Sequence, residues 1–127
     1  MSLNLADDIR AERLQLLADH ISGGVLTLYT APRPAIGAAI TTQTALVTVD
    51  IPGGLTVVDH LLTLSLAVET ILAEGLADWG RITRADTSFA VDGDCGLLAS
   101  EAGFRLKTLS LVATGQLIPI IATFAEA

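Results

Sequence analysis

The sequence is poor in the residues from which most metal and redox sites are built. Cys95 is the only cysteine among 127 residues, so no intramolecular disulfide can form, and folding in a reducing cytoplasm is compatible with this composition. The histidines His20 and His60 stand far apart in the sequence, whereas metal sites usually take several His, Cys or carboxylate ligands at close spacing. We therefore expect a structural or solvent-facing role for both histidines, no metal and no cofactor.

Basic residues are also few and scattered. Seven Lys and Arg stand against fourteen Asp and Glu, which gives a net charge of −7 and leaves no stripe of positive charge to neutralise phosphates. The sequence therefore predicts no binding to nucleic acid.

Long uncharged runs are missing, although 51% of the residues are hydrophobic and the mean hydropathy is +0.61. The most apolar stretch, residues 61–72, contains Glu69 and lies between Asp59 and Glu74. It falls short of the roughly 18–20 uncharged residues that a membrane-spanning helix needs. The start of the chain has no basic region followed by an apolar run, so we expect no secretory signal and no membrane partner. Burial of apolar surface in a homo-oligomer explains the high hydropathy better.

The beginning of the chain, residues 4–21, predicts a helix. Asn4 is a plausible N-cap, and Gly23 and Gly24 supply the stop. Glu12 interrupts the narrow apolar stripe that runs along this segment at helical spacing. The stripe consists of Leu5, Ile9 and Leu16.

After Gly24 the sequence predicts short strands separated by turns, because β-branched and alternating apolar residues replace the helical spacing. The expected strands are residues 25–30, 44–50, 61–68, 77–84, 88–91, 104–112 and 117–124. Between them we expect a loop at 31–40, a tight turn or loop at 92–96 and a hairpin connection at 113–116. Pro119 in the last strand indicates an edge position or a bulge, because proline cannot donate to a ladder.

The clearest alternation lies in residues 61–68. Thr63 and Ser65 would face outward, and the opposite face would point into the core. A helix over residues 57–72 is the competing interpretation. The predicted core face consists of Leu62, Leu64, Leu66 and Val68.

These patterns predict one mainly β domain over residues 1–127. We expect an antiparallel β-sandwich or open barrel in residues 23–127, preceded by an N-terminal α-helix in residues 1–22. The helix would pack across an open end of the β domain or serve as an arm toward a neighbour.

Two groups of residues are candidates for a site. Trp79 and Arg81 alternate on one predicted strand, where an exposed ring beside a guanidinium could contact a sugar or a neighbouring subunit. The only tryptophan of a chain with so few aromatic residues more often anchors the core. Asp92 and Asp94 could bind calcium, but the further ligands of an EF-hand are missing, and Cys95 lacks a nearby histidine to form a thiolate. An Asp-Gly turn and an unreactive cysteine are therefore preferred, and we expect no catalytic residue.

A further pattern lies in the order of glycines, aromatics and turns. It comprises Gly-Val-Leu-Thr-Leu-Tyr at 24–29 followed by Pro34, Ala-Asp-Trp-Gly-Arg-Ile at 77–82, Phe-Ala-Val-Asp-Gly at 89–93 with Gly96, and 107–112 with Gly115 and a closing strand at Phe124. In this order the stretches resemble a family of small structural proteins of tailed phages and prophages, in which a helix usually precedes the β domain. The chain departs from the family at 94–95 and 97–98, where the family usually has a segment rich in Gly and Ser.

The resemblance implies a virion structural role as a head-decorating, head–tail or tail-associated component, without catalytic residues. It also implies assembly in the cytoplasm of a bacterial host, with other virion proteins as partners. The leading prediction is therefore a non-enzymatic phage-like structural protein that acts through self-association or docking on a larger assembly. The alternatives are a carbohydrate- or small-ligand-binding β-sandwich module that uses Trp79 and Arg81, and an enzyme of unfamiliar type at Asp92, Asp94 and Cys95.

Overall fold

The computed structural model of the chain describes residues 6–58, 61–68, 71–112 and 118–125. Its elements, in chain order, are α1 (Asp7–Ile21), β1 (Val25–Tyr29), β2 (Ala45–Asp50), β3 (Leu61–Val68), β4 (Gly75–Leu76), β5 (Trp79–Thr83), β6 (Phe89–Leu97), β7 (Phe104–Leu106), β8 (Ser110–Leu111) and β9 (Ile118–Ala125).

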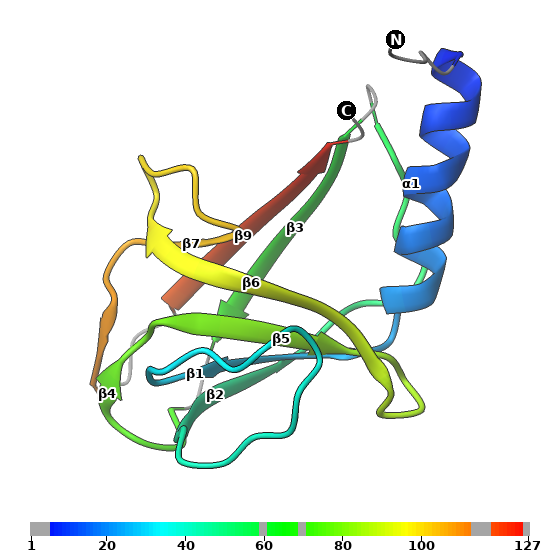
Figure 1. Ribbon diagram of the computed structural model, residues 1–127. Helices are drawn as coiled ribbons and strands as arrows, with labels where there is room; N and C mark the ends of the chain where they lie inside the picture. The colour runs from blue at the N-terminus through cyan, green and yellow to red at the C-terminus, as the bar shows by residue number, and fades with distance from the viewer. Residues whose placement is uncertain (1–5, 59–60, 69–70, 113–117, 126–127) are drawn as a thin grey trace, which may run out of the picture.

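Seven of these strands form one sheet in the order β2-β1-β5-β6-β7-β9-β3. Neighbouring strands are antiparallel except β6 and β7, which are parallel. The sheet curls into a half-barrel, with β3 and β9 rising steeply from the level of β1, β2 and β5 (Figure 1). The short strands β4 and β8 pair separately. The predicted class, a mainly β domain that is a sandwich or open barrel with an N-terminal helix, is confirmed; the form observed is a mostly antiparallel half-barrel.

Helix α1 packs beside β3 (Figure 1) and buries a different face from the one predicted. The predicted stripe is wrong, because Ile9 and Leu16 are 44% and 58% exposed, while Leu5 lies outside the described residues. Burying that stripe would also have buried the carboxylate of Glu12, which is costly without a partner. The buried face, at i, i+4, i+7 spacing, consists of Leu14, Ala18 and Ile21.

The end of α1 follows the prediction. The backbone N–H of Ser22 donates to Ala18 O at 2.9 Å, and Gly23 has a φ of +75°, which glycine adopts without steric cost. The predicted cap Asn4 lies outside the described residues.

Strand β3 confirms the alternation read from the sequence and excludes the helix over residues 57–72. Thr63 and Ser65 are exposed, as predicted. The side chain of Val68 lies outside the described set. The other three predicted core residues are buried: Leu62, Leu64 and Leu66.

A pair of opposed glycines brings β5 and β6 close to an aromatic ring of β7. Gly80 and Gly93 are register partners across the two strands. A Cβ on Gly80 would stand 2.8 Å from Leu28 Cδ2 and 2.9 Å from Phe104 Cδ2, and a Cβ on Gly93 would stand 2.9 Å from Phe104 Cε2. Such distances are far below ordinary carbon contacts, so the position of the Phe104 ring depends on both glycines.

The predicted turn or loop at residues 92–96 is wrong, because the whole segment lies inside β6. Aspartates favour turns when their side chains bond the nearby backbone. Here Asp92 is bonded to Arg81 on the neighbouring strand, and Asp94 accepts the N–H of Gly103. Tertiary partners therefore replace the local bonds that a turn would have supplied.

The predicted strand over residues 104–112 is divided between two sheets. Its first part, β7, lies between β6 and β9, and its last part, β8, pairs with β4. The N–H of Ala77 donates to Leu109 O at 2.8 Å, which draws the chain away from the main sheet before β8. The predicted hairpin connection at 113–116 lies outside the described residues.

The predicted edge position or bulge at Pro119 is wrong, because β9 lies between β7 and β3 and pairs with β3 in an unbroken register. Pro119 nevertheless occupies a locally open position. It is opposite Ala67 of β3. Leu61 of the same strand exchanges both backbone hydrogen bonds with Val58, so its N–H and C=O point away from β9. The N–H and C=O of Ala67 also point away from β9, because backbone orientation repeats at every second residue of a strand. In such a pair the nitrogen of Pro119 points away from β3. On that other side β7 ends at Leu106, opposite the next residue along β9, so the missing N–H removes no ladder bond.

Candidate functional site

Trp79, the first sequence candidate, is fully buried on β5. Its Nε1–H donates to Thr30 O at 3.0 Å, and its ring stacks on Tyr29 with centroids 4.6 Å apart. The tryptophan is buried, as the core interpretation expects, but it lies outside the main hydrophobic cluster. A sugar-binding platform requires an exposed ring face, which the ligand-binding alternative expects at Trp79, whereas this ring is buried.

Arg81, the second candidate, forms a buried two-pronged ion pair with Asp92. Its Nε and Nη2 donate to Asp92 Oδ1 and Oδ2 at 2.7 and 3.0 Å. The guanidinium carbon also lies 5.2 Å from the ring centroid of Trp79 and 5.4 Å from that of Phe89. The cation is thus held between two aromatic rings and one carboxylate, an arrangement suited to the planar guanidinium.

The two charges of this pair stabilise each other. Hydrogen bonding to Asp92 raises the pKa of Arg81 above its usual value. Burial by itself would raise the pKa of Asp92, but hydrogen bonds from Arg81 and from the N–H of Gly37, together with the charge of Arg81, outweigh burial and lower that pKa. Both groups are therefore charged at neutral pH.

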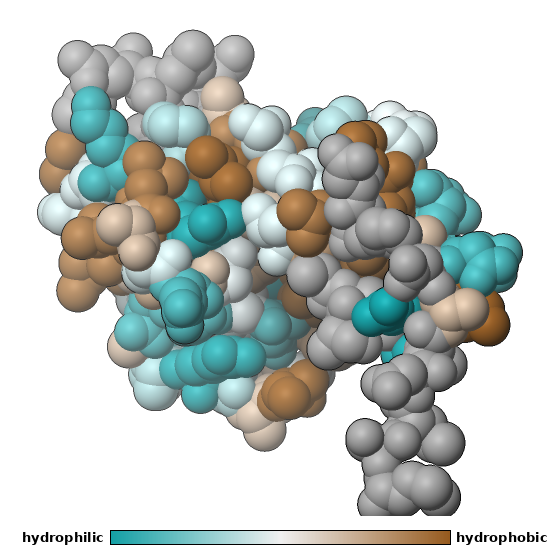
Figure 2. Space-filling view, turned by 90° about the horizontal axis from the view of Figure 1, so that it is seen from above, coloured by the Kyte–Doolittle hydropathy of each residue, from teal (hydrophilic) through white to brown (hydrophobic). Residues whose placement is uncertain are grey.

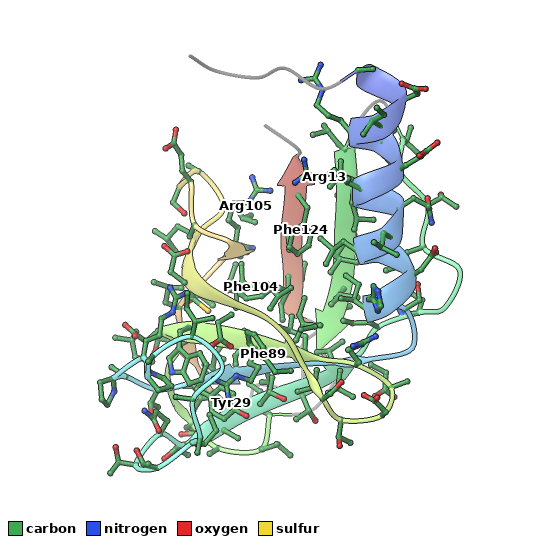
Figure 3. The ribbon with its side chains drawn as sticks, turned by 45° about the vertical axis from the view of Figure 1, so that its right-hand side comes forward. Arg13, Tyr29, Phe89, Phe104, Arg105 and Phe124 are labelled. Atoms are coloured by element: carbon green, nitrogen blue, oxygen red, sulfur yellow. The ribbon has the colours of Figure 1, made fainter. Side chains whose placement is uncertain are left out.

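The cluster also holds the long loop between β1 and β2. Asp92 Oδ2 accepts the N–H of Gly37 at 2.9 Å. Within the loop, Gln43 Nε2 donates to Pro32 O at 2.6 Å, and Trp79 fixes the first loop residue through Thr30 O. Figure 1 shows this loop lying in front of β5, and Figure 3 shows Tyr29 and Phe89 on the same side of the molecule, away from Arg13 and Phe124. Trp79 and Arg81 thus serve to anchor a loop.

What the anchored loop presents is apolar. Residues 35–40 read Ala-Ile-Gly-Ala-Ala-Ile without a charge, and all but Ala38 are exposed. Ile36 is 77% exposed, the largest fraction among the exposed large hydrophobic residues. In the sequence this segment is recognisable only as a loop. The two isoleucines in an uncharged stretch are the signal of its exposed apolar surface.

The remaining sequence candidates do not come together. The side chains of Asp92 and Asp94 point to the same face of β6, and the side chain of Cys95 points to the opposite face. Burial, then the charges of Asp78 and Asp94, raises the pKa of the Cys95 thiol to about 12, which disfavours the nucleophilic thiolate. Across the described ranges, no three His, Cys, Asp or Glu side chains form a group that could hold a metal ion.

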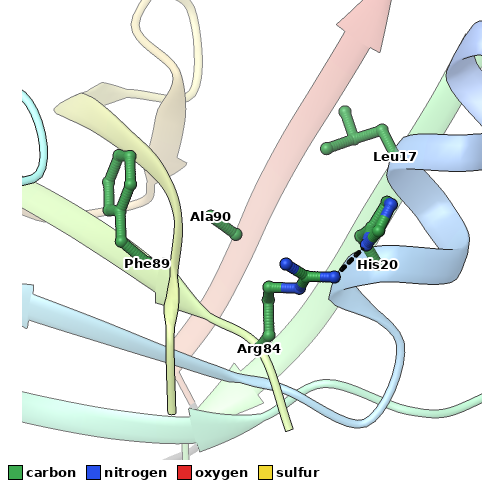
Figure 4. A pocket seen from close by; sticks show the side chains of 5 residues that line it. All are labelled: Leu17, His20, Arg84, Phe89 and Ala90. Atoms are coloured by element: carbon green, nitrogen blue, oxygen red, sulfur yellow. Dashed lines mark hydrogen bonds between the residues drawn. The ribbon is translucent and has the colours of Figure 1, made fainter. Parts of the chain in front are cut away.

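His20 lies at the end of α1, and His60 lies outside the described residues. The Nδ1 of His20 accepts a hydrogen bond from Arg84 Nη2, which places a guanidinium beside the C-terminus of the helix, where cations are favourable. Both residues border a hollow of about 230 Å³ between the end of α1, the turn after β5 and the start of β6 (Figure 4). Its other lining residues are apolar: Leu17, Phe89 and Ala90.

Large hydrophobic side chains are exposed at many places in the described chain. In the view from above they lie in several separate patches among polar residues (Figure 2). None of the described residues belongs to a helix that is long and apolar enough to cross a membrane. The exposed set is Ile9, Leu16, Ile36, Ile40, Val58, Leu61, Leu72, Leu76, Phe89, Leu97, Leu98 and Val112.

Comparisons of the chain with protein-family models, with curated proteins and with solved structures gave no match.

Proposed function

We propose that this protein is a non-enzymatic structural protein that acts by self-association or by docking on a larger assembly. The observation that supports the proposal best is the uncharged segment 35–40, which exposes Ile36 on a loop anchored to the sheet. Exposed apolar segments cost free energy in water and gain it when another protein covers them.

The anchoring makes the loop suited to this role. A flexible loop would lose conformational entropy on binding, which weakens the complex. This loop is already held by Asp92 at Gly37 and by Trp79 at Thr30, so less order remains to be imposed. The ion pair thus supports the interaction by holding the loop that presents Ile36.

The setting we propose is a virion of the tailed-phage type, with other virion proteins as partners and assembly in a bacterial cytoplasm. This part of the proposal is supported by the order of glycines, aromatics and turns in the sequence. The many exposed hydrophobic residues are consistent with a protein that works within an assembly.

Sedimentation velocity over a wide concentration range tests the self-association. We expect the wild-type protein to form larger species as its concentration rises, and the Ile36→Ser variant to need higher concentrations. Ile9→Ser is the matched control, because Ile9 is an exposed isoleucine on α1 and the substitution removes the same groups. A wild-type protein that stays monomeric at every concentration would refute self-association.

A further inference from the structure

The apolar loop segment and the hollow beside α1 are neighbours on one surface. A Cβ on Gly37 would stand 3.3 Å from Phe89 Cδ2, so the loop packs on the Phe89 ring. Phe89 also lines the hollow, together with Ala90 on the same strand (Figure 4). The exposed Ile36 and the hollow are therefore neighbours, with Phe89 between them.

The charges of this surface suit contact with a second copy of the chain. Each copy carries a net charge of −7, so two copies repel wherever their acidic surfaces meet. Residues 35–40 carry no charge, and the ionisable residues that line the hollow are His20 and Arg84, which are both basic. Contact between this segment and this hollow brings no two carboxylates together.

The arrangement also suits two-fold symmetry. In an isologous dimer the same patch is used twice, so a protrusion on each copy must meet a depression on the other. The hollow of about 230 Å³ is open to the surface, and three of its five lining residues are apolar. We infer that a second copy of this chain is the partner: Ile36 of each copy enters the hollow of the other, between Leu17 and Ala90. This inference rests on the proposed self-association.

Two variants test the two halves of this contact by sedimentation equilibrium. Ile36→Ser removes the protrusion, and Ala90→Leu fills the hollow. Because each contact occurs twice in the dimer, and a lost aliphatic contact weakens binding about tenfold, each variant should raise the dissociation constant about a hundredfold. The matched controls are Ile9→Ser and Ala99→Leu, which alter exposed residues on α1 and in the loop after β6 and should leave the constant unchanged.

Cross-linking provides a test that does not depend on the stability of the Ala90→Leu variant. Ile36→Cys and Leu17→Cys are made in separate chains, each with Cys95→Ser, and are mixed under mild oxidation. A disulfide between the two chains requires close approach of the two positions, so we expect a cross-linked pair. When the second chain carries Ile9→Cys in place of the Leu17→Cys substitution, no cross-linked pair should form.

The outcomes separate this inference from the proposed function. If the Ala90→Leu variant dimerises as strongly as the wild type, and no cross-link forms between positions 36 and 17, the inferred contact is overturned and self-association stands. A monomeric wild type would overturn both. Loss of dimer in both hollow and loop variants, with the cross-link present, supports both.

Discussion

The carboxylate of Asp92 is buried and forms an ion pair with Arg81. We predict that Asp92→Asn, which keeps the shape of the side chain, destabilises the protein strongly. The variant removes the negative charge that faces Arg81. The side chain of Asp92 is 0% exposed and that of Arg81 is 10% exposed. The guanidinium then remains buried between Trp79 and Phe89 without a counter-charge.

The magnitude follows from the burial of both partners. Removing one member of a buried ion pair costs about 3–5 kcal/mol. The asparagine oxygen can still accept one hydrogen bond, so we expect the lower end, about 3 kcal/mol. Domains of this size have a total unfolding free energy of about 5–15 kcal/mol, and the loss should lower Tm by about 10 °C.

Urea unfolding followed by circular dichroism measures the loss directly. Asp50→Asn, the same substitution at an exposed position of β2, is the control and should change the free energy of unfolding by less than about 0.5 kcal/mol. The double variant Arg81→Met with Asp92→Leu should recover to within about 1 kcal/mol of wild type, because it removes both charges together. A loss below about 1 kcal/mol for Asp92→Asn, or a double variant no more stable than the single one, would refute the reasoning.

Three further predictions concern the pH dependence, the glycine pair and the thiol. Because the pKa of Asp92 in the folded protein is lowered, the contribution of Asp92 to stability is complete well above pH 4 and is lost as the pH falls through that lowered pKa. The wild-type protein should therefore lose more stability in acid than the Asp92→Asn variant. Urea unfolding midpoints measured from pH 7 to pH 2 will show this difference. Gly80→Ala should destabilise by about 1–3 kcal/mol or more, because the added methyl group meets the Phe104 ring; an unchanged Tm would contradict this. The thiol of Cys95 should react with Ellman's reagent at pH 8 far more slowly in the folded than in the urea-unfolded protein, because its pKa of about 12 leaves almost no thiolate; equal rates would show the opposite.

Most of the strands could be predicted from the sequence because their signals are local. The alternation in β3 reflects one buried and one exposed face, and this property survives into the structure. Gly23 ended the helix for a similar reason, since a positive φ is a local requirement.

The misplaced turn at 92–96 and the misplaced helix face have a different origin. Asp92 and Asp94 find partners in Arg81 and Gly103, eleven and nine residues away in the sequence, and no local pattern shows these contacts. On α1, Leu16 belongs to the most regular apolar stripe, but the sheet covers the face with Leu14. Which apolar face is buried depends on the surface that the helix meets, and that surface is built from strands far along the chain.

Trp79 and Arg81 stand out in the sequence because tryptophan is rare in this chain and the two residues share one strand face. The sequence pattern does not show what these side chains contact. An aromatic beside an arginine has the same spacing on a strand whether it faces a ligand or a loop. The loop that covers them was readable only as a loop, because its attachment depends on the N–H of Gly37 meeting a carboxylate from β6.

This attachment gives a physical reason for a buried ion pair in a small β domain. A buried pair adds little net stability over apolar residues that fill the same space, so stability alone does not explain it. A leucine in place of Asp92 would fill the space but could not accept the N–H of Gly37, and the loop would lose the bond that fixes residues 35–40 on the sheet. The double variant Arg81→Met with Asp92→Leu is therefore expected to fold almost as stably as wild type and yet to associate more weakly. The ion pair then acts less on the fold than on the position of the apolar segment that the fold presents.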